Sequence, residues 1–167
     1  LVALADRDDS RQGPQRDHAG HECPGCLAFC CKLLPCAGTV AVLVPERLAL
    51  PGFLRATRWT DAAGGEAFFV MYELQDHAVL SSAPYLARLN APTPWSARMM
   101  PLHRHMVRTP CRVLHSSGAV TARQVLTLRL SPADGQGQAL QQGLAALAAR
   151  AAQQPGLVGL HLLRHDT

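Results

Sequence analysis

The sequence predicts an α+β protein that consists of one βαββαβ unit followed by an incomplete βαβ copy. Residues 53–59 and 66–74 have the alternating aromatic and β-branched pattern of strands, with two glycines between them, so they predict an antiparallel hairpin. Segments with helical spacing of apolar residues lie on both sides of this hairpin. A Pro-Gly pair leads from a helix into a strand at residues 51–52 and again at 155–156. This recurrence suggests an internal repeat.

A strand and a short helix are expected before the hairpin. Residues 27–34 are almost continuously apolar over the length of a buried strand. Residues 40–50 carry apolar side chains at helical spacing, but Pro45 lies inside this segment. Because proline has no N–H to donate and its ring clashes with the preceding turn, we expect a helix to begin at Pro45 or to be broken there.

A helix and a strand are expected to complete the first unit. Residues 79–89 predict a short amphipathic helix, and Pro92 and Pro94 are expected to end it. Residues 107–115 follow as a strand. Pro110 inside this strand favours a position at the edge of the sheet, since proline cannot donate to a neighbouring strand.

The incomplete copy is expected near the C-terminus. Residues 125–130 alternate as a strand, residues 138–153 predict an Ala- and Leu-rich helix, and residues 157–163 return as a strand. The N-terminal segment lacks apolar periodicity and is predicted to be irregular or disordered. We therefore predict three divisions. The Cys- and His-containing segment covers residues 1–26, the complete first unit covers residues 27–118, and the partial second unit covers residues 119–167.

Composition and charge exclude several classes of protein. A chain of 167 residues is long enough for one sizeable core or two small repeats. The net charge of +4 comes from 16 Lys and Arg against 12 Asp and Glu, without a basic run interleaved with aromatic residues, so nucleic acid is not an expected partner. We also expect no membrane span and no secretory signal, because no apolar stretch is long enough. A cytoplasmic protein with reduced thiols is therefore predicted.

Cysteine and histidine residues cluster near the N-terminus. Cys23 and Cys26 have the two-residue spacing of a zinc-binding pair, and His18 and His21 lie close by in the sequence. A structural zinc site needs a second ligand pair presented from elsewhere, and the remaining nearby cysteines are crowded into an apolar run. These four residues are therefore weak metal candidates, and we expect neither a stoichiometric metal nor another cofactor.

Four stretches carry motifs of a known family, at residues 44–56, 69–74, 92–95 and 100–101. They resemble a largely uncharacterised bacterial family of the dimeric α/β-barrel superfamily, near the EthD-like proteins. The resemblance implies a ferredoxin-like fold and a homodimer. The superfamily includes cofactor-free oxygenases, isomerases, decolourising enzymes and proteins without known activity, so the resemblance implies the fold far better than the chemistry. The resemblance is good over residues 44–115 and loose over residues 120–165. Residues 1–43 show no resemblance to the family.

The amino end departs from the family pattern. A complete unit needs a strand and a full helix before the Pro-Gly pair at residues 51–52. Counting back by the length of the second copy places that strand on residues 21–26, which contain proline and glycine and few apolar side chains. Either the first strand is shifted to 27–34 with a shortened helix, or residues 1–43 are foreign to the family.

Four titratable residues near the expected barrel are candidates for a pocket. Tyr72 and Glu73 are neighbours on a strand, so their side chains point to opposite faces and either one could line the pocket. His103 and His105 follow the Trp95 segment, and histidine is the usual proton carrier near neutral pH. If the barrel carries chemistry, we expect the acid or base to come from this group.

Two main classes of function are consistent with these features. The first is a small-molecule-binding protein or cofactor-free enzyme of the dimeric α/β-barrel superfamily. The second is a non-catalytic assembly or interaction module whose barrel is only an interface, and a zinc-binding N-terminal module is a third. A polar cavity near Tyr72, Glu73 and His103 would favour the first class, and a space filled by Phe and Leu the second. A homo-oligomer is expected, because the incomplete copy needs cover for its sheet.

Overall fold

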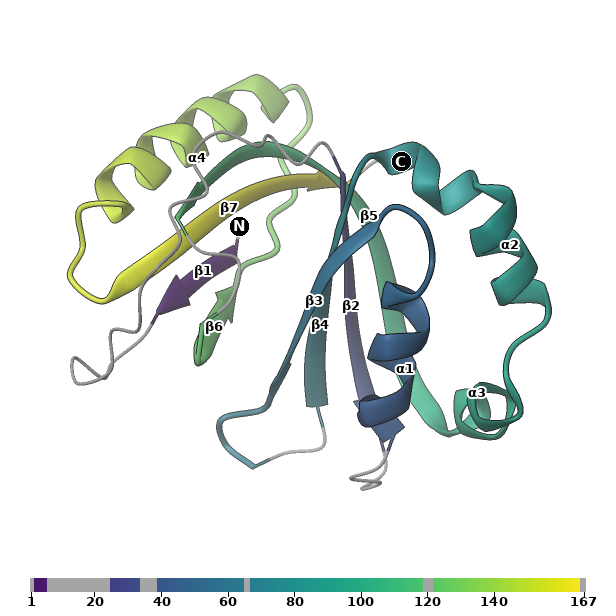
Figure 1. Ribbon diagram of the computed structural model, residues 1–167. Helices are drawn as coiled ribbons and strands as arrows, with labels where there is room; N and C mark the ends of the chain where they lie inside the picture. Colours follow the sequence, from purple (N-terminus) through teal and green to yellow (C-terminus); the bar gives the residue numbers. More distant parts are fainter. Residues whose placement is uncertain (1, 6–24, 34–38, 65–66, 119–121, 166–167) are drawn as a thin grey trace. The chain divides into compact units, whose positions relative to one another are not determined.

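The chain forms two compact units. The computed structural model describes residues 2–5, 25–33, 39–64, 67–118 and 122–165 (Figure 1), of which 2–5, 25–33, 39–43 and 104 are described by their backbone alone. The hairpin unit lies within Cys23–Arg112 and the terminal unit within Leu1–Glu22 and Val113–Arg164. Among the described residues, no helix is long and apolar enough to cross a membrane.

The hairpin unit contains a sheet in which each pair of neighbouring strands is antiparallel, in the order β3-β4-β2-β5. Thr57 pairs with Met71 and Trp59 with Phe69, so the predicted hairpin is confirmed. Strand β5 lies between β2 and β7 in the strand order and pairs with β2 at Pro110, so the edge position expected from this proline was wrong. The strands are β2 Gly25–Leu33, β3 Phe53–Thr60, β4 Ala67–Leu74 and β5 His103–Gly118.

A register shift at the start of β3 sets which residues share a face of the sheet. Phe53 pairs with Leu74, but Arg55 pairs with Glu73, so Leu54 is an extra residue in β3. Phe53 therefore lies on one face with Leu74, whereas Arg55 lies on the opposite face with Glu73.

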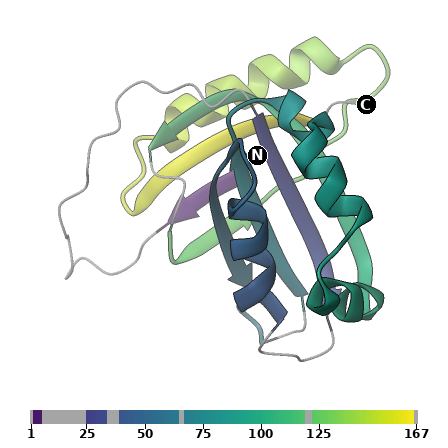
Figure 2. The ribbon, with the colours of Figure 1, turned by 45° about the vertical axis from the view of Figure 1, so that its right-hand side comes forward.

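Helices cover one face of the hairpin-unit sheet (Figure 2). The helical segments are α1 Thr39–Leu48, the 3₁₀ turn η1 His77–Ser81, α2 Ala83–Asn90, α3 Pro94–Met99 and the 3₁₀ turn η2 Met100–Leu102. With β2 as its first strand and a helix of 10 residues after it, the unit has the order βαββαβ. The backbone thus follows the alternative in which the first strand is shifted and the first helix is short.

The core of the hairpin unit lies between the sheet and these helices. Alternate residues of β4 point into it, as the period of a strand requires. Tyr85 from α2 and Val79 from η1 pack against them. The buried members are Leu50, Phe53, Phe68, Val70, Tyr72, Leu74, Val79 and Tyr85.

Proline and hydroxyl residues divide the helical region differently from the expectation. The single helix predicted at 79–89 is split, because the Ser82 hydroxyl accepts from the Tyr85 amide and starts α2 as its N-cap. Pro94 begins α3 instead of ending a helix, since its missing N–H is not needed in a first turn. Pro45 lies inside α1, so the expected break there was wrong. A proline removes one helical hydrogen bond, and the helix continues to Leu48.

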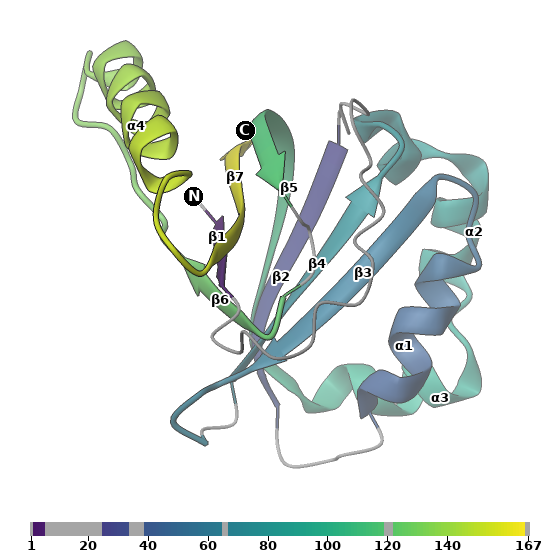
Figure 3. The same ribbon diagram turned by 60° about the vertical axis from the view of Figure 1, so that its left-hand side comes forward.

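The terminal unit contains strands in the order β5-β7-β1-β6 and one long helix. Strand β1 is antiparallel to both β6 and β7. Figure 3 shows α4 along one face of these strands, and its Ala148 is buried. The elements are β1 Val2–Ala5, β6 Gln124–Thr127, α4 Gly137–Ala151 and β7 Leu157–His165.

Two expectations for the terminal unit differ from the structure. Residues 1–26 were expected to be irregular, but Val2–Ala5 forms a strand that pairs on both of its sides. Five apolar residues are too few for a periodicity to be recognised, and the pairing partners lie more than 100 residues away in the sequence. The strand predicted at 125–130 ends at Thr127.

Candidate functional site

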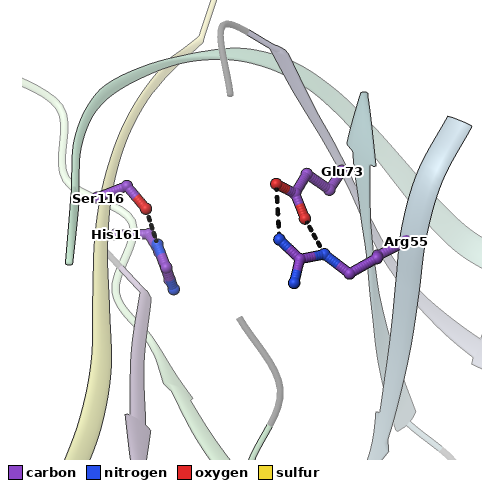
Figure 4. Close-up of polar contacts among 4 residues, drawn as sticks. All are labelled: Arg55, Glu73, Ser116 and His161. Atoms are coloured by element: carbon purple, nitrogen blue, oxygen red, sulfur yellow. Dashed lines mark hydrogen bonds and ion pairs between the residues drawn. The ribbon is translucent and has the colours of Figure 1, made fainter. Parts of the chain in front are cut away.

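Tyr72 and Glu73 lie on opposite faces of β4, as their adjacent positions require. Tyr72 is 2% exposed and belongs to the core, with its ring edge-on to Phe53 at a centroid distance of 5.7 Å. The Glu73 carboxylate forms a bidentate ion pair with Arg55, at 2.6 Å to Nε and 3.1 Å to Nη2 (Figure 4). The Glu73 oxygens are therefore already engaged, and Tyr72 is packed among apolar side chains.

His103 and His105 differ in their surroundings although they are two residues apart. His103 is half-buried and its ring lies edge-on to Phe68, 6.3 Å between centroids. Burial lowers the pKa of His103 from its ordinary value of 6.5, and a hydrogen bond with the backbone of Met100 partly opposes this shift. His105 is exposed and has a φ of 52°, in the left-handed region.

The four predicted pocket residues are thus not gathered in one place. Phe68 and Tyr72 are both on the helix-covered face of β4, and His103 contacts Phe68 at the margin of this face. Glu73 is on the other face, and His105 is directed to solvent.

Of the four metal candidates, only Cys26 is among the described residues. His18, His21 and Cys23 lie outside the described residues, and Cys26 is described by its backbone, which pairs with Glu73 and Cys111. Within the described part of the chain, no group of three or more His, Cys, Asp or Glu side chains is placed to hold a metal ion.

Two arginines and one tyrosine form a second polar group on the helix-covered side, here called the arginine–tyrosine site. The guanidinium carbon of Arg47 at the end of α1 lies 5.4 Å from the centre of the Tyr85 ring. That of Arg108 on β5 lies 5.3 Å from the same ring, and its Nη2 donates a hydrogen bond to the Tyr85 hydroxyl. Three separate elements thus bring two cations to one aromatic ring.

The carboxylate nearest to Arg47 in the sequence is occupied elsewhere. Glu46 accepts from the Thr93 hydroxyl at 2.6 Å and from the Ser96 hydroxyl at 2.7 Å, one hydrogen bond to each of its oxygens. Thr93 also caps α3 by accepting from the Ser96 amide. This cluster fixes α1 to α3 and leaves Glu46 committed to the hydroxyls.

Arg47 Nη1 is buried and has no hydrogen-bond partner among the described residues. A buried guanidinium N–H without a partner is costly, because it has lost its water and gained nothing in return. The planar fork of arginine matches the oxygens of a carboxylate or phosphate. The arginine–tyrosine site is therefore chemically suited to an anionic oxygen.

A third arginine lies against another aromatic ring on the same face. The guanidinium carbon of Arg58 is 4.8 Å from the centre of the Phe68 ring, which also contacts His103. Positive charge is thus repeated along the helix-covered face at Arg47, Arg58 and Arg108.

The arginine–tyrosine site is not among the residues that the sequence predicts for a pocket. Arginine does not change its charge near neutral pH, and Arg47, Tyr85 and Arg108 lie in three segments that only the fold brings together. Their one sequence signal is that Arg47 and Arg108 each have an apolar residue beside them, Leu48 and Val107. That signal is weak, because surface arginines are common.

Comparisons with known proteins identify the fold. No family model matches the chain, and no curated protein is significantly similar to it. The structure of an anthrone oxidase-like protein is similar with a TM-score of 0.54 at 12% identity, covering 86% of this chain and 67% of that one. The chain thus has a ferredoxin-like α+β fold, which it shares with that protein.

Two further solved structures have lower TM-scores. A mutant of SnoaB, a cofactor-independent oxygenase from Streptomyces nogalater, has a TM-score of 0.39 at 12% identity and covers 65% of this chain and 96% of that one. PA3566 from Pseudomonas aeruginosa has a TM-score of 0.35 at 15% identity and covers 57% of this chain and all of that one, at 100%.

Proposed function

We propose that the hairpin unit binds a small organic anion at the arginine–tyrosine site, as a small-molecule-binding protein or cofactor-free enzyme. The observation that carries the proposal is the buried Nη1 of Arg47, which lacks a hydrogen-bond partner among the described residues. An incoming carboxylate, enolate or phenolate oxygen would satisfy this donor and offset the repulsion between Arg47 and Arg108, which lie on one ring.

The apolar surroundings favour an organic anion over an inorganic one. Tyr85 is 2% exposed and stacks on Phe53 at a centroid distance of 5.7 Å, so the arginines lie at the border of an aromatic core. A ligand with a planar apolar body and one anionic oxygen would match both parts. We therefore propose an aromatic or enolic acid as the ligand class.

His103 is the candidate for proton transfer in an enzyme of this kind. Its lowered pKa keeps the imidazole neutral near pH 7, and a neutral imidazole can accept a proton. Arg58 lies over the same Phe68 ring and would favour the anion left by that transfer. The fold is shared with an anthrone oxidase-like protein, and a cofactor-free enzyme that acts on a planar organic anion is the function that we propose for this chain.

Titration calorimetry with benzoate, salicylate and 1-naphthoate tests the proposal, with benzamide as the neutral counterpart of benzoate. We expect the carboxylates to bind and benzamide to bind at least tenfold more weakly. Arg47→Gln should weaken carboxylate binding by about 10- to 100-fold, since a hydrogen bond to a charged group is worth about 1.5–3 kcal/mol.

Arg98→Gln is the matched control, because Arg98 is exposed on α3 and lies in none of the contacts described at the site. Its affinity should equal that of the unmodified chain. Equal affinity for benzoate and benzamide, or equal losses in the two arginine variants, would contradict an anion site at Arg47.

The assembly module remains a second candidate because of how the core is packed. Around Tyr72, the space between sheet and helices is occupied by Phe53, Leu74 and Tyr85. If none of the carboxylates binds and the chain self-associates, the interaction module becomes the better proposal.

A further inference from the structure

Ser116 and His161 are directly opposed on neighbouring strands of the terminal unit. A Cβ on Gly118 of β5 would lie 3.0 Å from the Cα of Gly159 on β7. Two residues back along β5, the Ser116 Oγ lies 2.8 Å from Nδ1 of His161, two residues forward along β7 (Figure 4). From the first contact to the second, the residue number falls along β5 and rises along β7, so the two strands are antiparallel here. Ser116 and His161 therefore form a cross-strand pair.

The two side chains differ in their access to solvent. Ser116 is exposed, whereas His161 is 3% exposed and lies between the buried Leu160 and Leu162 on β7. In the tautomer that carries its proton on Nε2, the Nδ1 atom accepts from the serine hydroxyl. The structure thus places an accessible hydroxyl next to a buried imidazole. Both residues lie on strands, which position side chains more precisely than loops do.

We propose that Ser116 and His161 form a nucleophile–base pair that accepts acyl groups from carboxylic esters. The Ser116 Oγ would form a bond to the ester carbonyl carbon while its proton passes to His161 Nδ1. The bond between that carbon and the alcohol oxygen then breaks, and the alcohol takes the proton from the imidazole. Water repeats the sequence on the acyl-serine, releasing the carboxylic acid and restoring the hydroxyl, so the net reaction is ester hydrolysis.

A purely structural hydrogen bond would look the same in the structure, because a buried imidazole nitrogen needs a partner. Reactivity separates the two roles. A structural serine hydroxyl reacts no faster than any other exposed serine, whereas a hydroxyl deprotonated by a positioned base gains about 10²- to 10⁴-fold in rate.

A fluorophosphonate probe on the full chain tests the pair. It reacts with an activated serine by forming an Oγ–P bond with loss of fluoride, and tandem mass spectrometry locates the adduct. We expect one adduct, at Ser116, that is absent in Ser116→Ala and present in Ser117→Ala. Ser117 is the matched control because it adjoins Ser116 and points to the opposite face of β5.

His161→Gln should slow labelling of Ser116 by about 100-fold. His115→Gln should not change it, because His115 is exposed and lies on the face of β5 opposite to Ser116. Labelling at other residues, or an unchanged rate in a folded His161→Gln variant, overturns the proposal. If circular dichroism shows that this variant does not fold, the pH dependence of labelling decides. If an imidazole is the base, the labelling rate should stop rising with pH once the imidazole is neutral. A labelling rate that rises tenfold per pH unit over the whole range overturns the proposal.

Discussion

The Thr93 hydroxyl both caps a helix and links two helices. Its hydroxyl accepts from the Ser96 amide at the start of α3 and donates to the Glu46 carboxylate of α1. Ser82 also caps a helix, α2, by accepting from a backbone amide. The two residues therefore allow the capping contribution to be separated from the link between helices.

We expect Thr93→Ala to lower the free energy of unfolding by roughly 2–4 kcal/mol, because it removes a cap and a hydrogen bond to a charged group. Ser82→Ala should cost only about 1 kcal/mol, the usual contribution of a cap. Urea denaturation of the two variants measures the difference. Equal losses would show that the hydroxyl–carboxylate bond at Glu46 adds no stability.

His103 gives the stability of the chain a dependence on pH. Its folded pKa lies below the unfolded value of 6.5, so the unfolded chain binds more protons as the pH falls through and below that value. The free energy of unfolding should therefore be highest above pH 6.5 and decrease as the pH drops towards the folded pKa.

The prediction is tested by measuring unfolding free energies from pH 5 to 8 for the unmodified chain and for His103→Gln. The variant should show a shallower decrease on the acidic side. His105→Asn serves as the control, because His105 is exposed and asparagine tolerates the left-handed backbone at that position. A slope that His103→Gln leaves unaltered would contradict the assignment.

Gly52 joins α1 to β3 in a conformation that few other residues tolerate. Its φ is +86°, and an added Cβ would lie 2.4 Å from Cγ2 of Val79. Gly64 in the hairpin turn also has a positive φ, of +77°, but an added Cβ would meet nothing within 4 Å. The Pro-Gly pair recognised in the sequence thus marks a close approach of the chain to η1 as well as a turn.

Gly52→Ala should therefore destabilise the chain by about 2–5 kcal/mol, from backbone strain together with overlap in the core. Gly64→Ala should cost about 1–2 kcal/mol, from strain alone. Thermal or urea unfolding of both variants provides the comparison, and in a Val79→Ala background the cost of Gly52→Ala should fall. The absence of such coupling would rule out contact with Val79 as the cause.

At the scale of the elements, strands were predictable where the pattern is local. The hairpin β3–β4 is recognisable because alternation, aromatic residues and turn glycines agree. Strand β1 was not recognisable, since its four residues are held by β6 and β7 and carry no period of their own. Helix α3 was missed because proline was interpreted as an end, and only the Thr93 cap shows that it is a start.

The candidate sites were less predictable than the fold for the same reason. Tyr72 was expected on either face of its strand, and only the register of β3 against β4 assigns it to the core and Glu73 to the pair with Arg55. The arginine–tyrosine site and the Ser116–His161 pair each join segments that are distant in the sequence. No local pattern marks residues whose significance arises from long-range pairing.

At the scale of the whole molecule, the edge strand β6 and the residues after it expose apolar side chains. Strand β6 pairs with β1 and is the last strand in its order. Leu126 on β6 is 59% exposed, and Leu130 shortly after it is 55% exposed. An apolar edge strand is a template for pairing with another chain.

We therefore predict that the chain is at least a dimer at micromolar concentration in sedimentation velocity, and that Leu126→Arg shifts it towards the monomer. Leu89→Arg is the control, since Leu89 is equally apolar and 40% exposed but belongs to the helix α2 and not to a strand. A monomer in the unmodified chain would contradict the prediction of a homo-oligomer.

The extra residue in β3 has a consequence for how the gene can change in length. Since Phe53 and Arg55 already pair with successive residues of β4, loss of the codon for Leu54 would leave each later side chain on its present face. Loss of Thr57 would instead exchange the faces of the residues on one side of the gap. The hairpin therefore has a spare residue at position 54, and deletions in natural or selected variants should be found there and not two or three positions further along.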